Sequence, residues 1–448
     1  MIPADLLQAA RSAAAPERSG RVRSSVGLRI EVEGVVAAIG DLVTVDVDGR
    51  ELPSEVVAIE AETLVCLPLG RPEGIRYGQR ATVSPGGLTV PVGDGLFGRV
   101  LDGLGRPIDG LPLPAGTPRI PLAATAPAPL TRRPVSEQLV FGVKTLDTLL
   151  ACGRGQRLGI FAGSGVGKST LLGMLARGTA AECSVIALVG ERGREAEEFV
   201  RERLGAGLSS SVVVVATSDQ PAMVRVQAAF VATRIAEGFR DQGRDVMLLT
   251  DSLTRFAMAQ REVGLAAGEP PATRGYPPSV FSLLAALLER AGGSEQGSIT
   301  GLYTVLVEGD DMDEPIADAA RSVLDGHVVL SRHIAQMGEF PAIDVLASVS
   351  RLADRLVTEP QRRVATRARR LLAVYGEAKD LIEVGAYRAG TSSDIDEAIA
   401  ARGPLRAALA QRSDEIVDVN QAWDRLSEAV SGQTAAADPI PHLVGGAV

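Results

Sequence analysis

A glycine-rich turn between a strand and a helix constrains the fold of this chain more than any other segment. The apolar run RLGIFA leads into AGSGVGKST at residues 162–170, and the helical pattern LLGMLAR follows directly. Small residues let the backbone curl so that successive N–H groups and the N-terminus of the next helix face phosphate oxygens. The sequence therefore predicts a phosphate loop in an α/β domain.

The residues of this loop form the predicted binding site for a nucleoside triphosphate. They are Ala162, Gly163, Ser164, Gly165, Val166, Gly167, Lys168, Ser169 and Thr170. We expect Lys168 to contact the β- and γ-phosphates and the Ser169 hydroxyl to ligate Mg²⁺. Ala162 replaces the first glycine of the strict pattern, which a position without a positive φ tolerates.

The use of lysine singles out the same loop. Of 46 basic residues, only Lys144, Lys168 and Lys379 are lysines. Arginine thus serves wherever positive charge alone is needed, whereas a phosphate loop requires a compact ammonium group. A glycine-rich turn with an incidental lysine is the alternative, and the strand before the loop and the helix after it argue against it.

Two carboxylates follow apolar strands of the same predicted sheet. Asp251 ends DVMLLTD and can position Mg²⁺ or its water, a role compatible with a helix N-cap. Glu191 follows SVIALV in the segment GERGRE and can orient the attacking water. A lone loop acid is more often structural, but a position beside a phosphate loop favours catalysis. Arg192 or Arg194 can contact phosphate or pair with nearby acids.

The hydrophobic pattern divides the chain into four parts. Residues 25–95 hold short alternating apolar runs, which predict a small β-barrel. Residues 1–24 form an N-terminal arm, in which residues 4–14 are either a short amphipathic helix or a frayed terminus. Residues 96–365 alternate strand and helix patterns, as a mostly parallel sheet requires. Residues 366–448 read as amphipathic helices followed by a frayed end.

Composition excludes several classes of protein. Acidic residues number 55 against 46 basic ones, a net charge of −9, so the electrostatic footprint of a dedicated nucleic-acid binder is absent. No apolar run reaches the roughly 18 residues of a membrane helix, and the N-terminus does not read as a secretory signal. The three scattered cysteines form no CxxC pair, and the three histidines have no ligand spacing. We therefore expect a cytoplasmic protein without a zinc site.

The motifs together resemble those of the rotary-ATPase and type III secretion ATPase superfamily. They are AGSGVGKST, GERGRE, LLTDSLTRFAMAQRE and, at residues 341–350, PAIDVLASVS. Residues 266–281 and 303–318 look like the type III export ATPases, and the absence of a DELSEED-like acidic helix makes an ATP synthase catalytic subunit the weaker reading. The resemblance covers nearly the whole chain. It implies a β-barrel, a central RecA-like P-loop domain with a mostly parallel sheet, and a C-terminal helical domain.

The resemblance also implies roles for individual residues. Lys168 and Ser169 would hold phosphate and Mg²⁺, Glu191 would be the catalytic carboxylate, and Asp251 the Walker B acid. Arg192 would be an accessory phosphate contact. The related noncatalytic ATP synthase subunit is expected to lack a carboxylate at the position of Glu191, so its presence argues for turnover.

Two further positions follow from the same resemblance. Arg351, directly after ASVS, matches an arginine finger that acts on a neighbour's nucleotide, which implies a homohexameric ring. A surface salt bridge is the alternative for this residue. Residues 357–370 align with the stretch expected near the adenine, where Gln361 stands in place of an aromatic residue of some relatives.

The function implied is Mg²⁺-dependent ATP hydrolysis that energises type III protein export. The segment PQRRVATRARRLLAVYGEAKDLIEVGAYRAG resembles the flagellar versions, and the ATPase of a virulence secretion system is the nearest alternative. A ring-shaped nucleic-acid translocase would need exposed aromatics on the barrel, where residues 25–95 contain only Tyr77. A noncatalytic docking ring is a further alternative.

Partners and location follow from the resemblance as well. It implies a stator-like regulatory partner at the N-terminal helix, and chaperones and a central stalk at the C-terminal domain. Export substrates and the export gate complete the set, and no nucleic acid is expected. The chain would be cytoplasmic and peripheral to the membrane export apparatus.

Overall fold

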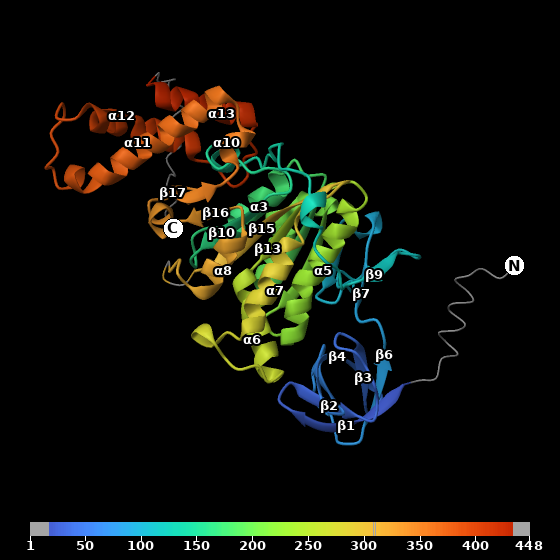
Figure 1. The fold of residues 1–448 in the computed structure, drawn as a ribbon. Coiled ribbons are helices and arrows are strands. Elements are labelled where there is room, and N and C mark those ends of the chain that lie inside the picture. Colours follow the sequence, from blue (N-terminus) through green and yellow to red (C-terminus); the bar gives the residue numbers. More distant parts are fainter. Residues whose placement is uncertain (1–17, 308, 310, 433–448) are drawn as a thin grey trace, which may run out of the picture.

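Three structural units follow one another along the molecule. The structure is a computed structural model that describes residues 18–307, 309 and 311–432. A barrel lies at one end, an α/β domain in the middle and a group of helices at the other end (Figure 1). This confirms the predicted architecture. The predicted N-terminal helix at residues 4–14 lies outside the described residues.

The barrel is closed by six antiparallel strands in the order β1-β2-β5-β4-β3-β6. They are β1 (Ser19–Val26), β2 (Arg29–Glu33), β3 (Leu42–Val47), β4 (Arg50–Glu60), β5 (Thr63–Pro68) and β6 (Arg80–Ser84). Apolar side chains such as Val43 and Val45 alternate into the interior. Because β1 starts at Ser19, the barrel begins ahead of the boundary expected at residue 25.

A two-residue turn sets the register of the β3–β4 hairpin. Asp48 and Gly49 have φ values of 54° and 86°, the left-handed region that the favoured hairpin turn demands at both central positions. The Asp46 carboxylate accepts a hydrogen bond from the Gly49 N–H and holds this turn closed.

The central sheet runs in the order β17-β16-β10-β15-β13-β11-β12-β8, with β14 beside β15. Its strands are β8 (Val100–Asp102), β10 (Arg157–Ala162), β11 (Cys183–Glu191), β12 (Ser211–Thr217), β13 (Asp245–Asp251), β14 (Gly292–Gly293), β15 (Ser298–Leu306), β16 (Gly326–Leu330) and β17 (Ile343–Ser350). Every pairing along this order is parallel except that of the edge strand β17 with β16. All nine residues of β11 are buried, as expected for a strand covered on both faces.

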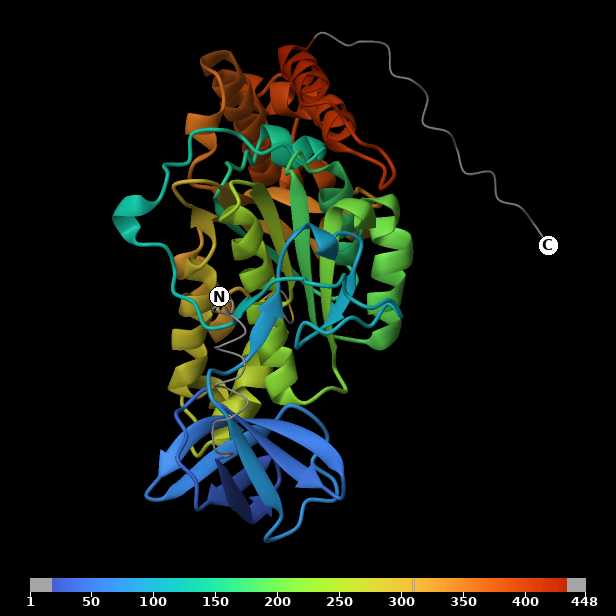
Figure 2. The same ribbon diagram turned by 90° about the vertical axis from the view of Figure 1, so that its right-hand side faces the viewer.

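Helices cover both faces of this sheet, and two short strands form a separate ribbon (Figures 1 and 2). The helices of this domain are α2 (Lys144–Thr148), α3 (Lys168–Gly178), α4 (Gly193–Glu198), α5 (Ala222–Arg240), α6 (Leu253–Ala266), α7 (Pro278–Glu289), α8 (Pro315–Val323) and α9 (Arg332–Gln336). The ribbon pairs β7 (Thr89–Pro91) with β9 (Arg119–Pro121). None of the helices in the described ranges has the length and apolarity needed to cross a bilayer.

The last unit consists of α10 (Ala353–Leu356), α11 (Glu359–Glu383), α12 (Ser393–Leu409) and α13 (Val419–Ser431). Leu371, Leu405, Trp423 and Leu426 belong to its core. The boundary expected at residue 366 falls inside α11, which begins at Glu359 because Thr358 and Gln361 form a capping box there. We call α11, α12 and α13 the helical layer.

Candidate active site

The phosphate loop joins the carboxyl end of β10 to the first residue of α3. Gly165 and Gly167 have φ values of 78° and 90°, which side chains with a Cβ rarely adopt. Ala162 ends β10 in a buried position without a positive φ, so an alanine fits there. No side chain caps the N-terminus of α3, which leaves its first N–H groups directed at the loop. These features suit an anion with several oxygens.

Lys168 meets both predicted carboxylates. Its Nζ lies 2.5 Å from Asp251 Oδ1 and 3.5 Å from Glu191 Oε1. Glu191 ends β11 and Asp251 ends β13, and these strands are parallel neighbours in which Asp251 pairs with Leu188. Because parallel strands end at the same edge, three residues far apart in the sequence converge beside the loop.

Glu191 is buried, and its carboxylate lies near one negative group, Asp251, and two positive groups, Lys168 and Arg255. Its pKa is raised from the ordinary value, first because of burial and then because of the nearby Asp251 carboxylate. The ammonium of Lys168 and the guanidinium of Arg255 act in the opposite direction. Arg255 Nε lies 3.2 Å from Glu191 Oε1, and the same side chain donates a hydrogen bond to the Gly190 carbonyl. The result is a carboxylate with increased proton affinity held in a fixed orientation.

Asp251 and Ser169 are the oxygen donors expected to hold Mg²⁺. Asp251 is buried, and its Oδ1 accepts a hydrogen bond of 2.7 Å from Thr304 Oγ1. Ser169 is exposed in the first turn of α3. Mg²⁺ prefers oxygen ligands and takes few of them from the protein when phosphates supply the others. This donor set therefore fits Mg²⁺, and the described residues contain no cluster of three His, Cys, Asp or Glu side chains that suits another metal.

Arg192 does not join this cluster. It precedes α4, its side chain is 77% exposed, and its Nη1 pairs with Glu195 Oε1 at 3.2 Å. Gln361 lies in the first turn of α11, where its Oε1 accepts a 2.9 Å hydrogen bond from the Thr358 N–H. The structure thus gives each of these two side chains a local partner.

Arg351 lies near the amino-terminal ends of the parallel strands, whereas the phosphate loop lies at their carboxyl ends. It follows β17, whose last residue Ser350 pairs with Gly326 at the start of β16. The Arg351 N–H donates to the carbonyl of Asp325, whose side chain in turn accepts from the N–H of Arg157, the first residue of β10. Because the phosphate loop follows the other end of β10, roughly 15 Å of strand lies between the two. The exposed Arg351 therefore lies far from the nucleotide site of its own chain.

The structure adds Phe340 and Arg255 to the residues selected from the sequence. Phe340 is 47% exposed, and a Cβ placed on Gly167 would lie 3.6 Å from two atoms of its ring. An exposed aromatic side chain beside a phosphate loop can stack on a nucleotide base. The signal for Phe340 was its position directly before the PAIDVLASVS segment, and for Arg255 its place one turn after Asp251.

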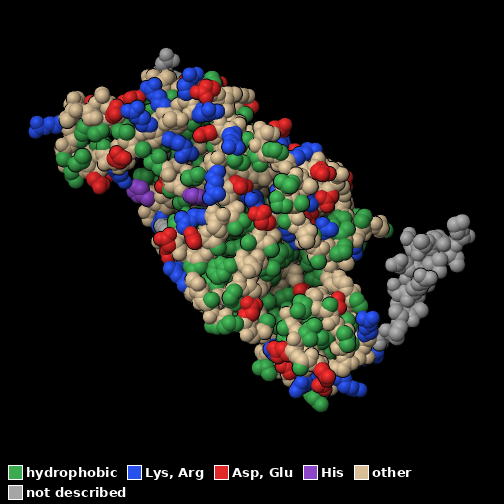
Figure 3. Space-filling view, in the orientation of Figure 1, with side chains coloured by type: hydrophobic (Ala, Val, Ile, Leu, Met, Phe, Trp, Pro, Cys, Tyr) green, Lys and Arg blue, Asp and Glu red, His purple; other side chains and the backbone are tan. Residues whose placement is uncertain are grey.

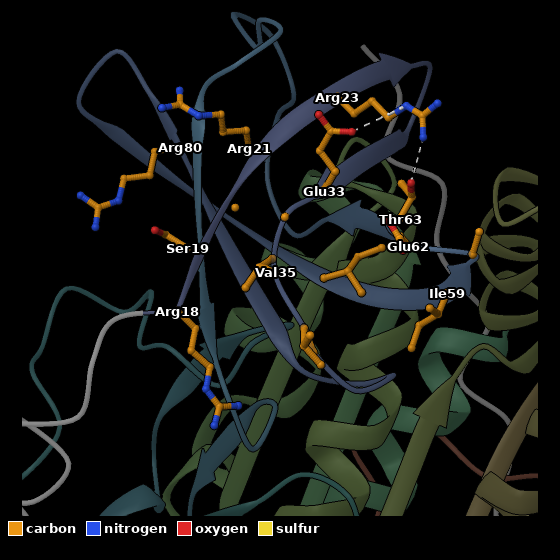
Figure 4. Close-up of a pocket in the computed structure, with 16 residues that line it drawn as sticks. Arg18, Ser19, Arg21, Arg23, Glu33, Val35, Ile59, Glu62, Thr63 and Arg80 are labelled. Carbon is orange, nitrogen blue, oxygen red and sulfur yellow. Dashed lines mark hydrogen bonds and ion pairs between the residues drawn. The ribbon is translucent and has the colours of Figure 1, made fainter.

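A large hollow on the barrel contains none of these residues. Its volume is about 1560 Å³, and its lining includes Arg18, Arg21, Arg23 and Arg80. Figure 4 shows Arg23 engaged with Glu33 and Thr63 rather than directed into open space. The hollow is formed by barrel residues alone and is separate from the site at the edge of the central sheet.

Two family models match consecutive parts of the chain. The nucleotide-binding domain of the ATP synthase alpha/beta family matches residues 142–350. The T3SS EscN ATPase C-terminal domain matches residues 357–428. The first match includes the phosphate loop and both carboxylates, and the second covers most of the helical layer.

Individual relatives match over most of their length. The flagellum-specific ATP synthase of Bacillus subtilis (strain 168) is 50% identical over 403 residues, which are 89% of this chain and 92% of that protein. The type 3 secretion system ATPase of Xanthomonas euvesicatoria is 48% identical over 420 residues, 93% of this chain and 94% of that protein.

A solved structure agrees with these relatives. The assembled ATPase EscN from the type III secretion system of enteropathogenic E. coli is 43% identical with a TM-score of 0.87, and the match covers 92% of this chain and 100% of that one. EscN in complex with its central stalk EscO matches with a TM-score of 0.85. The chain therefore belongs to the family of type III export ATPases, flagellar and virulence-associated, and is an ATP hydrolase that serves type III protein export.

Proposed function

We propose that the chain is the ATPase of a flagellar export apparatus and that Lys168, Glu191 and Asp251 perform its hydrolytic step. The observation that carries this proposal is the convergence of these three side chains beside the phosphate loop. Lys168 binds the β- and γ-phosphate oxygens. Asp251 and the Ser169 hydroxyl hold Mg²⁺, which when bound offsets the negative charge of the phosphates.

Glu191 acts on the attacking water. Its buried carboxylate accepts a hydrogen bond from that water and takes its proton as the bond to the γ-phosphorus forms, while ADP leaves on the opposite side. Arg255 holds the carboxylate in place through its contact with Oε1. Arg192 stays a candidate for an accessory phosphate contact, which would require it to leave Glu195.

Phe340 is the residue that we assign to the adenine. Its exposed ring borders Gly167, whereas the amide of Gln361 is engaged in the cap of α11. A stacked aromatic ring contributes on the order of 1–3 kcal/mol per base. Substitution of Phe340 by Leu should therefore raise the KM for ATP about fivefold or more with little change in kcat.

The substitution Glu191→Gln tests the hydrolytic role. It removes the proton acceptor but keeps the size of the side chain, so we expect kcat to fall about 10²-fold or more while ATP binding is retained. The matched control is Glu197→Gln, which changes an exposed acid of α4 that pairs with Arg201. Full activity of Glu191→Gln would contradict the assignment.

We further propose that identical subunits complete one another's sites in a homohexameric ring, with Arg351 as the finger. Support comes from its position at the end of the strands opposite the loop and from the assembled state of EscN. An arginine finger is worth about 10³-fold or more in turnover. Arg351→Ala should lose turnover and keep nucleotide binding.

A mixing experiment separates a finger in trans from a surface ion pair. Arg351→Ala keeps Glu191, and Glu191→Gln keeps Arg351, so an interface between the two variants contains one complete site. Mixed assemblies of these two inactive proteins should regain part of the wild-type activity. Absence of any gain, with assembly verified, would refute the shared site.

The flagellar assignment is supported by the 50% identity to the Bacillus subtilis protein and by residues 360–390, which form α11 and the turn after it. It predicts that the chain restores swimming to a strain that lacks its flagellar ATPase. Restoration of virulence secretion instead would favour the second candidate, which the Xanthomonas relative supports.

The partners that we propose are a central stalk, as EscN binds EscO, and a stator-like regulator at the N-terminal residues. Chaperones and export substrates would be handled at the ring, which would sit in the cytoplasm against the export gate. Deletion of residues 1–17 should abolish binding of the regulator without loss of ATP hydrolysis, and intact binding would argue against that docking site.

A further inference from the structure

Gln411 is a buried side chain at the junction of the helical layer with the central domain. It lies directly after α12, and every polar group of its amide has a partner. Oε1 accepts a 2.9 Å hydrogen bond from the Lys144 N–H, and Nε2 donates to the carbonyls of Gly142 and Glu415 at 2.7 and 2.9 Å. A buried amide with all its groups satisfied is held in one orientation.

The main chain of the same residue reaches the turn that carries Phe340. The Gln411 N–H donates a 2.9 Å hydrogen bond to the Phe340 carbonyl. The Phe340 ring in turn borders Gly167 of the phosphate loop. A residue of the segment that joins α12 to α13 is therefore hydrogen-bonded to the backbone of Phe340, whose ring lies beside the phosphate loop.

The turn around Phe340 lies between α9 and the end of α12. A cavity of about 190 Å³ lies between it and the end of α12, lined by Phe340, Pro341, Leu409 and Ala410 among others. Another contact comes from Arg406 of α12, whose Nη2 lies 2.7 Å from Glu339 Oε1. Backbone hydrogen bonds from Gly338 and Glu339 to α9 hold one side of the turn, and the contacts from Gln411 and Arg406 hold the side that faces α12.

The side chain of Gln411 is anchored to a segment that packs on the C-terminal end of α3. A Cβ placed on Gly142 would lie 3.3 Å from the backbone of Gly178 at the end of α3. Lys144 Nζ also donates to the Ala410 carbonyl at 2.7 Å and pairs with Glu415 Oε1 at 3.2 Å. The segment that binds Gln411 thus packs against the helix that begins at Lys168.

We propose that Gln411 is a positioning residue for nucleotide binding, which ties the Phe340 ring to the segment behind α3 and so sets the affinity and base preference of the enzyme. The proposal rests on the assignment of Phe340 to the base. It does not involve the phosphoryl-transfer step, because Gln411 touches neither the loop nor the carboxylates. The packing of the helical layer and the binding of the base are therefore coupled through one amide.

Kinetics of Gln411→Ala and Gln411→Met test this role. Both remove the amide, and Met keeps most of the volume, so agreement between them excludes a simple packing defect. We expect the KM for ATP to rise about fivefold with kcat within about twofold, and the preference for ATP over CTP to decrease, because the larger purine loses more stacking. A fall in kcat at unchanged KM and base preference would overturn the proposal.

A double-mutant cycle with Phe340→Leu identifies the path of the effect. If Gln411 acts through Phe340, Gln411→Ala adds little to the KM of the Phe340→Leu variant. Independent, multiplicative effects would overturn the proposal. The matched control is Gln227→Ala, another buried glutamine that bonds across two units, to Glu55 of the barrel, and its KM should equal that of the wild type.

The same cycle distinguishes failure of this inference from failure of the base assignment. An unchanged KM in Phe340→Leu would refute the assignment of Phe340 and the inference with it. A raised KM in Phe340→Leu together with an unchanged KM in Gln411→Ala would refute only the role of Gln411.

Discussion

The two ends of the central domain are joined to their neighbours in different ways. At the helical end, Lys144 and Gln411 are buried and bonded across the boundary to backbone and side chains on both sides. At the barrel end, apolar side chains such as Leu42 and Val57 pack against the core of the central domain beside a hollow of about 640 Å³, and the Gln227 side chain donates a 2.6 Å hydrogen bond to Glu55. Figure 3 shows hydrophobic side chains gathered where the barrel meets the central domain.

We expect the junction with the helical layer to influence the nucleotide site and the junction with the barrel to leave that site unaffected. The polar network at the helical end includes the Phe340 carbonyl, and through it the proposed role of Gln411 couples the helical layer to the nucleotide site. The hollow at the barrel end is lined by residues such as Phe230 of α5 and Leu283 of α7, and its lining includes no residue of the phosphate loop. We therefore expect substitutions at the helical end to alter both stability and ATP binding, and those at the barrel end to alter stability alone.

The largest expected effect is that of Lys144→Met. The substitution leaves the Ala410 carbonyl and the partly buried Glu415 carboxylate without their ammonium partner, which should lower the free energy of unfolding of the helical layer by about 2–3 kcal/mol. Urea unfolding followed by Trp423 emission measures it, because Trp423 is the only tryptophan and lies in that core. Lys379→Met is the control, since this lysine has 31% of its side chain exposed and its loss should cost less than about 0.5 kcal/mol. Equal losses in both would contradict the comparison.

A smaller, pH-dependent effect is expected from Glu55→Gln at the barrel end. Burial raises the pKa of Glu55 from 4.5 to about 7, so the folded state binds its proton more tightly than the unfolded chain does. The contribution of Glu55 to the free energy of unfolding is therefore greatest below pH 4.5 and is lost as the pH rises through about 7. Glu55→Gln should stabilise the protein by about 1–2 kcal/mol at pH 8, a figure reduced because the side chain keeps some solvent contact.

Thermal unfolding of Glu55→Gln at pH 8 and pH 4.5 gives the measurement. The gain should vanish at the lower pH, where the wild-type carboxyl is already neutral, and the KM for ATP should not change at either pH. A gain of the same size at both values would show that the proton of Glu55 is not its cause.

The smallest signal is spectroscopic. Because the helical layer is coupled to the site, binding of a non-hydrolysable ATP analogue should change Trp423 emission with a midpoint equal to the dissociation constant. In Gln411→Ala this midpoint should move to higher concentration by the same factor as KM, whereas Gln227→Ala should leave it in place. If Trp423 emission does not change when the nucleotide binds, the helical end is no more coupled to the site than the barrel end, and the comparison is wrong.

The sequence predicted the three units and the convergence of Lys168, Glu191 and Asp251 because both depend on local patterns. A strand followed by a glycine-rich turn or a carboxylate places that group at the carboxyl edge wherever the sheet is parallel. Phe340 and Gln411 could not be found in this way. Their mutual contact joins residues 71 positions apart through a carbonyl and an N–H, groups that every residue carries.

Strand direction explains a further limit of the sequence reading. The motif that contains Arg351 was visible, but its placement near the amino-terminal ends of the parallel strands depends on β17 running antiparallel to β16, which no local pattern specifies. Gln361 was selected because its segment aligns with a stretch expected near the adenine. In the structure its side chain caps the N-terminus of α11 instead.

With Arg351 as the proposed finger, each subunit is a donor on one side and an acceptor on the other. Head-to-tail association of such units leaves an unused finger at one end of an open arc and an incomplete site at the other. An arc of n subunits therefore holds n−1 complete sites, and only closure supplies the last one. Hydrolysis per subunit then rises with assembly size and levels off at ring closure, so the enzyme's rate itself reports how complete the ring is.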